Sequence, residues 1–212
     1  NSDSKAFVVH DQFADTVTLV RADLKNIPAD NYIIVGKPQE GYRPYEEFIQ
    51  ESSDVEPTTN VVPQDTWILI YTSGTTGMPK GCVHFVRPAI IESKIVNKYV
   101  YKMQPGDVLG GAAPVSFAAG FGTFTLLPFE GGAAISLIPK FTPPDMLDLI
   151  QKHKITILTG LPTGYRALMK FPAFKDYDTS SVRLYTSGGD ALGGETLKGW
   201  QELTGKPIWE GL

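Results

Sequence analysis

The 212-residue chain has a single cysteine, Cys82, and only three histidines, His10, His84 and His153. One cysteine excludes an intramolecular disulfide and fits a reducing compartment, so we expect a cytoplasmic protein. Cys82 has no neighbouring base in the sequence, which favours packing over a nucleophilic role. The histidines do not share the spacing of a metal site, and we predict no metal ligands within this chain.

Long apolar runs and an excess of positive charge are also missing. No apolar run approaches the roughly 20 residues that a membrane-spanning helix needs. The chain has 19 Lys and Arg residues against 23 Asp and Glu residues, a net charge of −4. This balance favours neither nucleic acid nor an anionic membrane surface as a partner. Hydrophobic residues make up 42% of the chain, which argues against disorder and is enough for a large core.

The most informative segment is a run of glycine and hydroxyl residues, 71–81, directly behind the apolar segment 66–70. Gly74 and Gly77 let the backbone turn and approach a ligand closely. The ammonium group of Lys80 adds a positive charge, and the hydroxyl groups come from Thr72, Ser73, Thr75 and Thr76. Amide and hydroxyl donors that converge with one cation are the chemistry of a polyphosphate cradle. We therefore predict that residues 72–77 and Lys80 bind a polyphosphate group.

This run is not the common phosphate loop, in which a lysine directly follows the second glycine and a hydroxyl residue follows the lysine. Here Met78 and Pro79 separate Gly77 from Lys80, and Gly81 stands where the hydroxyl residue would be. A kinase or GTPase of that class is disfavoured. The alternative is an ordinary Gly/Ser/Thr-rich connection after a strand, which is a frequent kind of loop.

Strand-like and helix-like segments alternate along the chain, which predicts an α/β fold with a largely parallel sheet and helices on both faces. In the segment 143–153, Met146 and Ile150 recur at helical spacing with His153, and Thr142 can cap the helix before Pro143. A second helix is expected over 88–102 from Pro88, with Ile91, Ile95 and Tyr99 every four residues, and a third over 195–203. The short apolar strands are expected at 6–9, 32–35, 66–71, 107–110, 133–138, 155–159, 183–186 and 207–210.

The polar segment 52–60 has neither period and is typical of a surface connection. It separates an N-terminal flank, 1–62, from the part that contains the polyphosphate cradle, 63–212. Residues 1–50 contain too few apolar segments to predict a core of their own, so we interpret 1–212 as one incomplete domain.

At this point the sequence resembles the adenylate-forming superfamily of acyl-CoA synthetases, luciferases and peptide-synthetase adenylation domains. The run 71–81 is similar to its phosphate loop, and 113–121 is similar to a segment that carries an aromatic gate beside the acyl pocket. The segments 187–192 and 208–212 resemble the turn that contacts AMP and the strand that leads into a Gly-x-Thr-Glu motif. Within the superfamily the chain looks most like benzoate and 2-aminobenzoate CoA ligases, from the stretches 80–85 and 161–168. Those relatives often have histidine where this chain has Val86.

The resemblance implies three groups of site residues. Lys80 is the catalytic residue, reaching the β- and γ-phosphates of ATP as pyrophosphate leaves. Nucleotide contacts are implied for Thr72, Ser73, Gly74, Thr75, Thr76, Gly77, Gly188, Gly189, Asp190, Glu210, Gly211 and Leu212. The acid would lie against Phe117, Ala118, Gly120 and His84.

The residues themselves leave alternatives for two of these groups. Phe117 is followed by small residues and could form the wall of a flat pocket, but a phenylalanine in core packing is at least as common. Gly188, Gly189 and Asp190 follow the strand expected at 183–186, at the sheet edge where open α/β sheets bind ligands. They could also form an ordinary turn. Phe121 and Phe124 favour the core.

The resemblance also implies a reaction and its cofactors. It is that of an ATP-dependent acid–CoA ligase, with ATP, Mg²⁺ and CoA as cofactors and a small carboxylic acid, aromatic by preference, as substrate. The chain ends before the Gly-x-Thr-Glu motif, so we expect no turnover by this stretch alone. A carrier-protein thiol in place of CoA, or a non-catalytic nucleotide-binding module, are the alternative interpretations.

Overall fold

A five-stranded parallel sheet organises the larger part of the chain in the computed structural model, which describes residues 2–72, 77–111 and 113–211. The strand order is β10-β9-β8-β6-β7, and all neighbouring pairs are parallel. The strands are β6 (Val108–Gly111), β7 (Ala134–Leu137), β8 (Ile157–Gly160), β9 (Leu184–Ser187) and β10 (Ile208–Glu210). All five overlap strands that the sequence predicts.

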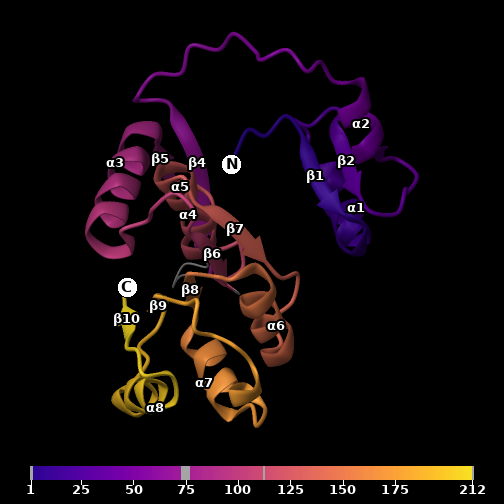
Figure 1. The fold of residues 1–212 in the computed structure, drawn as a ribbon. Helices are drawn as coiled ribbons and strands as arrows, with labels where there is room; N and C mark the ends of the chain where they lie inside the picture. Colours follow the sequence, from indigo (N-terminus) through magenta and orange to yellow (C-terminus); the bar gives the residue numbers. More distant parts are fainter. Residues whose placement is uncertain (1, 73–76, 112, 212) are drawn as a thin grey trace. The chain divides into compact units, whose positions relative to one another are not determined.

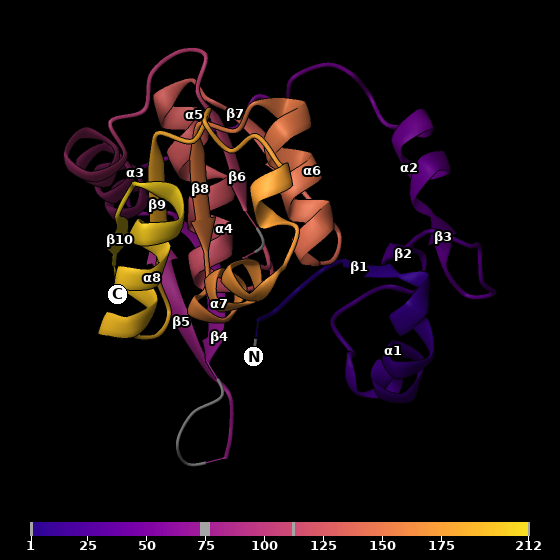
Figure 2. The same ribbon diagram turned by 60° about the horizontal axis from the view of Figure 1, so that its bottom comes forward.

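Successive residues of these strands enter different cores, because neighbouring side chains of a strand point to opposite faces. Leu158 and Tyr185 belong to a core shared with helices α6 (Pro143–His153), α7 (Pro162–Lys170) and α8 (Gly194–Thr204). Ile157 and Leu184 pack instead with residues of α4 (Ala118–Phe124) and α5 (Leu126–Gly131). Helices therefore cover both faces of the sheet, as predicted (Figure 1, Figure 2).

Helix α6 has the bounds that the sequence predicts. The backbone N–H of Asp145 donates to Thr142 Oγ1 over 3.2 Å, and Pro143 is the first helical residue. The buried face is formed by Met146, Leu147 and Ile150. His153 is exposed rather than part of this face, because the residue that continues the core beyond Ile150 is Ile155, after the helix has ended.

Helix α3 (Val86–Val96) differs from the prediction in its start and in its buried side. It begins before Pro88 and passes into a π-helical turn, Asn97–Tyr101. Its buried residues are Ala89 and Ser93, followed by Asn97 and Tyr101 in the π-helical turn. The apolar stripe of Ile91, Ile95 and Tyr99 is exposed instead. Small side chains at Ala89 and Ser93 allow α3 to lie close to α5.

The smaller compact unit comprises Asn1–Val62 and Tyr71–Cys82. Its parallel sheet contains β1 (Phe7–His10), β2 (Tyr32–Val35) and β3 (Arg43–Pro44), with helices α1 (Ala14–Val20) and α2 (Tyr45–Glu51). The sequence predicted no separate core for residues 1–50, but the flank has a small one. It consists of Val9, Ala14, Val17, Tyr32, Ile34 and Tyr42. Residues 52–60 are all exposed, as expected for a surface connection.

Strands β4 (Thr66–Thr72) and β5 (Lys80–Phe85) form a separate two-stranded sheet. The sequence predicts β4 but not β5. Single helical turns complete the described elements, at Asp11–Phe13, Arg21–Asp23, Ala29–Asn31 and Phe174–Asp176.

The carboxylate of Asp107 connects the beginnings of three strands of the five-stranded sheet. Its Oδ2 is 2.6 Å from Arg183 Nη2 and 2.8 Å from the backbone nitrogen of Gln104, and Thr156 donates to Oδ1 over 2.6 Å. Burial alone would raise the pKa of Asp107, but these hydrogen bonds outweigh it and hold the pKa below the usual 3.8. Arg183 also donates to the backbone oxygens of Tyr101 and Lys102.

We expect Asp107→Asn to lower the free energy of unfolding at pH 7 by about 1–3 kcal/mol, since it removes the charge that Arg183 faces. Because the folded-state pKa is lowered, this stabilisation is fully present above the unfolded pKa of about 4 and is lost as the pH falls below it, through the lower folded-state pKa. Urea unfolding of both proteins between pH 3 and pH 7 measures the effect. A constant difference across that range would contradict the assignment.

Candidate functional site

The two ends of the predicted phosphate cradle lie in the β4–β5 hairpin. Thr72 is the last residue of β4 and Lys80 the first residue of β5, and both are exposed. Gly77 has a left-handed φ of +94°, and none of the described residues lies within 4 Å of the position that a Cβ would take. Ser73, Gly74, Thr75 and Thr76 lie outside the described residues. The side chains of Thr72 and Lys80 are therefore accessible to an anion.

The other two predicted nucleotide segments meet at the carboxyl edge of the five-stranded sheet. Gly188 follows β9 and Gly211 follows β10, which is its neighbour in the sheet. The backbone nitrogen of Gly211 donates to Ser187 O over 2.8 Å. A Cβ at Gly188 would lie 3.2 Å from Gly211 O, so the close approach of the two backbones favours glycine there. Leu212 lies outside the described residues.

Polar groups are available at this edge. Asp190 is exposed, and its Oδ1 accepts a hydrogen bond from the backbone nitrogen of Ala191 over 2.8 Å. Glu210 is exposed at the end of β10, and its Oε1 accepts from the backbone nitrogen of Leu192 over 2.7 Å. The hydroxyl of Ser187 is buried without a hydrogen-bond partner among the described residues. A turn with backbone donors and these side chains could bind a polar ligand.

The segment predicted to contact the acid leads into helix α4. Phe117 directly precedes the helix, and 67% of its surface is exposed, so it is not a core residue within this part of the chain. Ala118 is exposed, while Gly120 is buried against the backbone of Pro114. Phe124 is in the core as predicted, and Phe121 packs on Trp67 with 5.4 Å between ring centroids.

Two further residues of β5 bear on the sequence predictions. His84 is exposed and lies on the strand that begins with Lys80. Cys82 is also exposed, so the expectation that it packs in the interior is wrong. All six residues of β5 are exposed, and both side chains are therefore accessible.

An apolar cavity of about 300 Å³ lies at the carboxyl end of β8 and was not predicted. The sequence signal was present, since half of its wall comes from the stretch 161–168 that carries part of the family resemblance. Its wall is formed by Pro114, Phe141, Met146, Leu158, Thr159, Gly160, Leu161, Thr163, Gly164, Tyr165, Ala167 and Leu168.

Tyr165 supports one side of this cavity. Its hydroxyl lies 3.0 Å from Leu158 O and 2.8 Å from Thr186 O, and so it connects β8 with β9. Burial keeps the pKa of Tyr165 well above the usual 10.0, with a smaller effect of Tyr185 and Tyr101 in the same direction. The hydroxyl is therefore a neutral structural donor rather than an acid or base at neutral pH.

Within residues 2–72, 77–111 and 113–211, no group of three or more His, Cys, Asp or Glu side chains could hold a metal ion. Over the same residues, no helix is long and apolar enough to cross a membrane.

The profile of the family described as "AMP-binding enzyme" matches residues 1–212. The chain belongs to this family. Of the curated relatives, an acetyl-coenzyme A synthetase of Shewanella sp. (strain ANA-3) is 32% identical over 67% of this chain. The benzoate–CoA ligase of Thauera aromatica is 30% identical over 71% of it. These matches cover 23% and 29% of the two relatives, so the matched part of the chain spans about a quarter of their length.

A solved structure of the anthranilate CoA ligase AuaEII, in complex with anthranoyl-AMP, is similar over 99% of this chain. The TM-score is 0.91, the sequence identity is 28%, and the match covers 41% of that protein. The α/β fold that the family resemblance implies for this chain is therefore confirmed.

Two glycines of helix α4 provide a test of how the Phe117 segment is positioned. We expect Gly120→Ala to lower the free energy of unfolding by about 1–3 kcal/mol, because the added Cβ would lie 2.1 Å from Pro114 O. Gly122→Ala is the matched control, since no atom in the described part of the chain lies within 4 Å of its Cβ position. Thermal unfolding measures both, and equal stabilities of the two variants would contradict the described packing.

Proposed function

We propose that this chain is part of an ATP-dependent carboxylic acid–CoA ligase that activates a small aromatic acid. The observation that carries the proposal is the close approach of the Gly188 and Gly211 backbones at the carboxyl edge of the sheet, in a chain of the AMP-binding enzyme family. Open α/β sheets bind ligands at this edge. In this proposal the turn 188–190 and the segment that follows Glu210 hold the AMP part of the nucleotide.

The proposed reaction has two steps. A carboxylate oxygen attacks the α-phosphorus of ATP, and the bond to pyrophosphate breaks, which gives an acyl-adenylate. The thiol of CoA then attacks the acyl carbonyl, and AMP leaves. The protein contributes positioning and charge stabilisation, and Lys80 with the hydroxyls of residues 72–76 would neutralise the departing pyrophosphate. Mg²⁺ would add positive charge when bound, but the described residues provide no ligand cluster for it.

Two observations support an aromatic acid. Phe117 is exposed at the start of α4, where its ring can form the wall of a flat pocket. The structure of AuaEII, with a TM-score of 0.91, has an anthranoyl group bound as its adenylate. The cavity at the carboxyl end of β8 adds apolar surface, which is available to the apolar part of a substrate.

We expect Lys80→Ala in the full-length protein to lower acid-dependent pyrophosphate release by about 10²–10³-fold, because one charged group that stabilises the transition state is lost. The fold should not change, since Lys80 is exposed. Lys152→Ala, on the exposed side of α6, is the control and should retain full activity. Near-normal release by Lys80→Ala would show that this role is wrongly assigned.

The acid is tested by pyrophosphate release from the full-length protein with benzoate, 2-aminobenzoate, phenylacetate, acetate and short fatty acids. We expect the highest kcat/KM with an aromatic acid, because Phe117 offers a flat apolar face. A preference for acetate, which the similarity to an acetyl-coenzyme A synthetase would suggest, removes the aromatic part of the proposal. Absence of activity with every acid removes the ligase assignment itself.

A further inference from the structure

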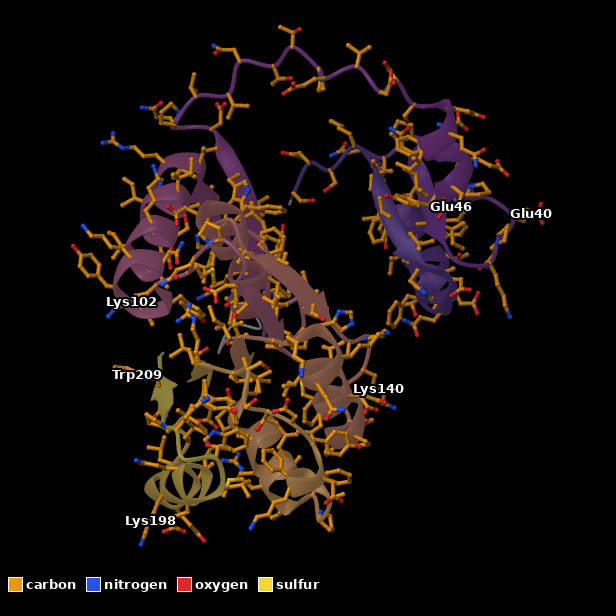
Figure 3. All side chains as sticks on the ribbon, in the orientation of Figure 1. Glu40, Glu46, Lys102, Lys140, Lys198 and Trp209 are labelled. Carbon is orange, nitrogen blue, oxygen red and sulfur yellow. The ribbon has the colours of Figure 1, made fainter. Side chains whose placement is uncertain are left out.

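A side chain at the end of strand β10 forms a hydrogen bond with the turn that precedes α8. Along β10, Ile208 is buried, whereas Trp209 is 62% exposed and points away from the strand (Figure 3). Because side chains alternate along a strand, Glu210 lies on the same face of β10 as Ile208. This alternation directs the Glu210 carboxylate toward the turn. Its Oε1 accepts a hydrogen bond from the backbone nitrogen of Leu192 over 2.7 Å.

The turn consists of residues 188–193, between β9 and α8, and has no regular secondary structure. At its start, the backbone nitrogen of Gly188 lies 3.4 Å from Gly160 O. In its middle, Asp190 accepts from the backbone nitrogen of Ala191. At its end, the Leu192 side chain is buried in the core that also contains Ile208. Leu192 is therefore anchored through its side chain by the core and through its backbone by Glu210.

A charged acceptor on a backbone N–H forms a stronger hydrogen bond than a neutral one. The contact between Glu210 and Leu192 closes a loop of the chain that includes α8, and it limits how far the turn can move from β10. The same turn carries Gly188 and Asp190, which the proposed function assigns to the nucleotide. The sequence alone implied that Glu210 contacts the ligand, but one of its carboxylate oxygens is already paired within the protein.

We propose that Glu210 is a positioning residue, which holds the turn 188–193 in the conformation that binds the nucleotide. The role in binding rests on the proposed function, whereas the contact with Leu192 does not. Two measurements on the full-length protein separate these parts. Both compare Glu210→Ala, Glu210→Gln and the control Glu202→Ala, whose exposed carboxylate lies on α8 at 3.9 Å from Lys198.

The first measurement is amide hydrogen exchange of residues 188–193 without nucleotide. We expect Glu210→Ala to raise the exchange rate at Leu192 roughly tenfold, because its N–H loses a charged acceptor. Glu210→Gln should retain most of the protection, since the amide oxygen can accept the same hydrogen bond, and Glu202→Ala should equal the wild type. Unchanged exchange at Leu192 in Glu210→Ala would overturn the proposal.

The second measurement is steady-state pyrophosphate release with varied ATP. We expect Glu210→Ala to raise the KM for ATP roughly tenfold while kcat changes less than about twofold, because an unpositioned turn weakens binding. Glu210→Gln should restore the wild-type KM. An equal loss in both variants would assign the carboxylate charge to direct ligand contact and contradict the positioning role. If the wild-type protein shows no ATP-dependent release, the proposed function fails, and the exchange measurement still decides whether the contact exists.

Discussion

Burial of a parallel sheet on both faces is the constraint on which the larger unit depends. Parallel strands joined through helices must place those helices on the two faces, and the strands then need apolar side chains in both directions. Ile157 and Leu158 show this directly, since they are neighbours in β8 but belong to different cores. Because the five strands are parallel, their carboxyl ends all lie at one edge of the sheet.

The loops at that edge are available for ligand binding, because helices cover the faces of the sheet and not the ends of its strands. β9 and β10 are neighbours, so the turns that follow them are brought together without any sequence proximity. Gly188 and Gly211 allow the backbones to approach, and Glu210 and Asp190 add charge. The amino ends of the strands are held differently, by the buried carboxylate of Asp107 and the guanidinium of Arg183.

The accuracy of the sequence predictions depends on how local the relevant interactions are. Helix α6 was predicted with its correct bounds because its start is encoded by Thr142, Pro143 and Asp145 within four residues. The buried side of α3 was not predicted, because Ser93 and Asn97 interrupt any apolar stripe there and only packing against α5 buries these small residues. Strand β5 was missed for the same kind of reason, since its pairing with β4 is what makes it a strand.

The sequence by itself determined the α/β class, the positions of most strands, the glycine- and hydroxyl-rich run before Lys80 and the family, because periodicity and short motifs are local properties of the chain. Only the tertiary structure decided that Phe117 is exposed, that a cavity lies at the end of β8, and that Glu210 pairs with Leu192. Each of these depends on residues that are far apart along the chain and become neighbours only when the strands and helices pack, and no local pattern specifies such a contact.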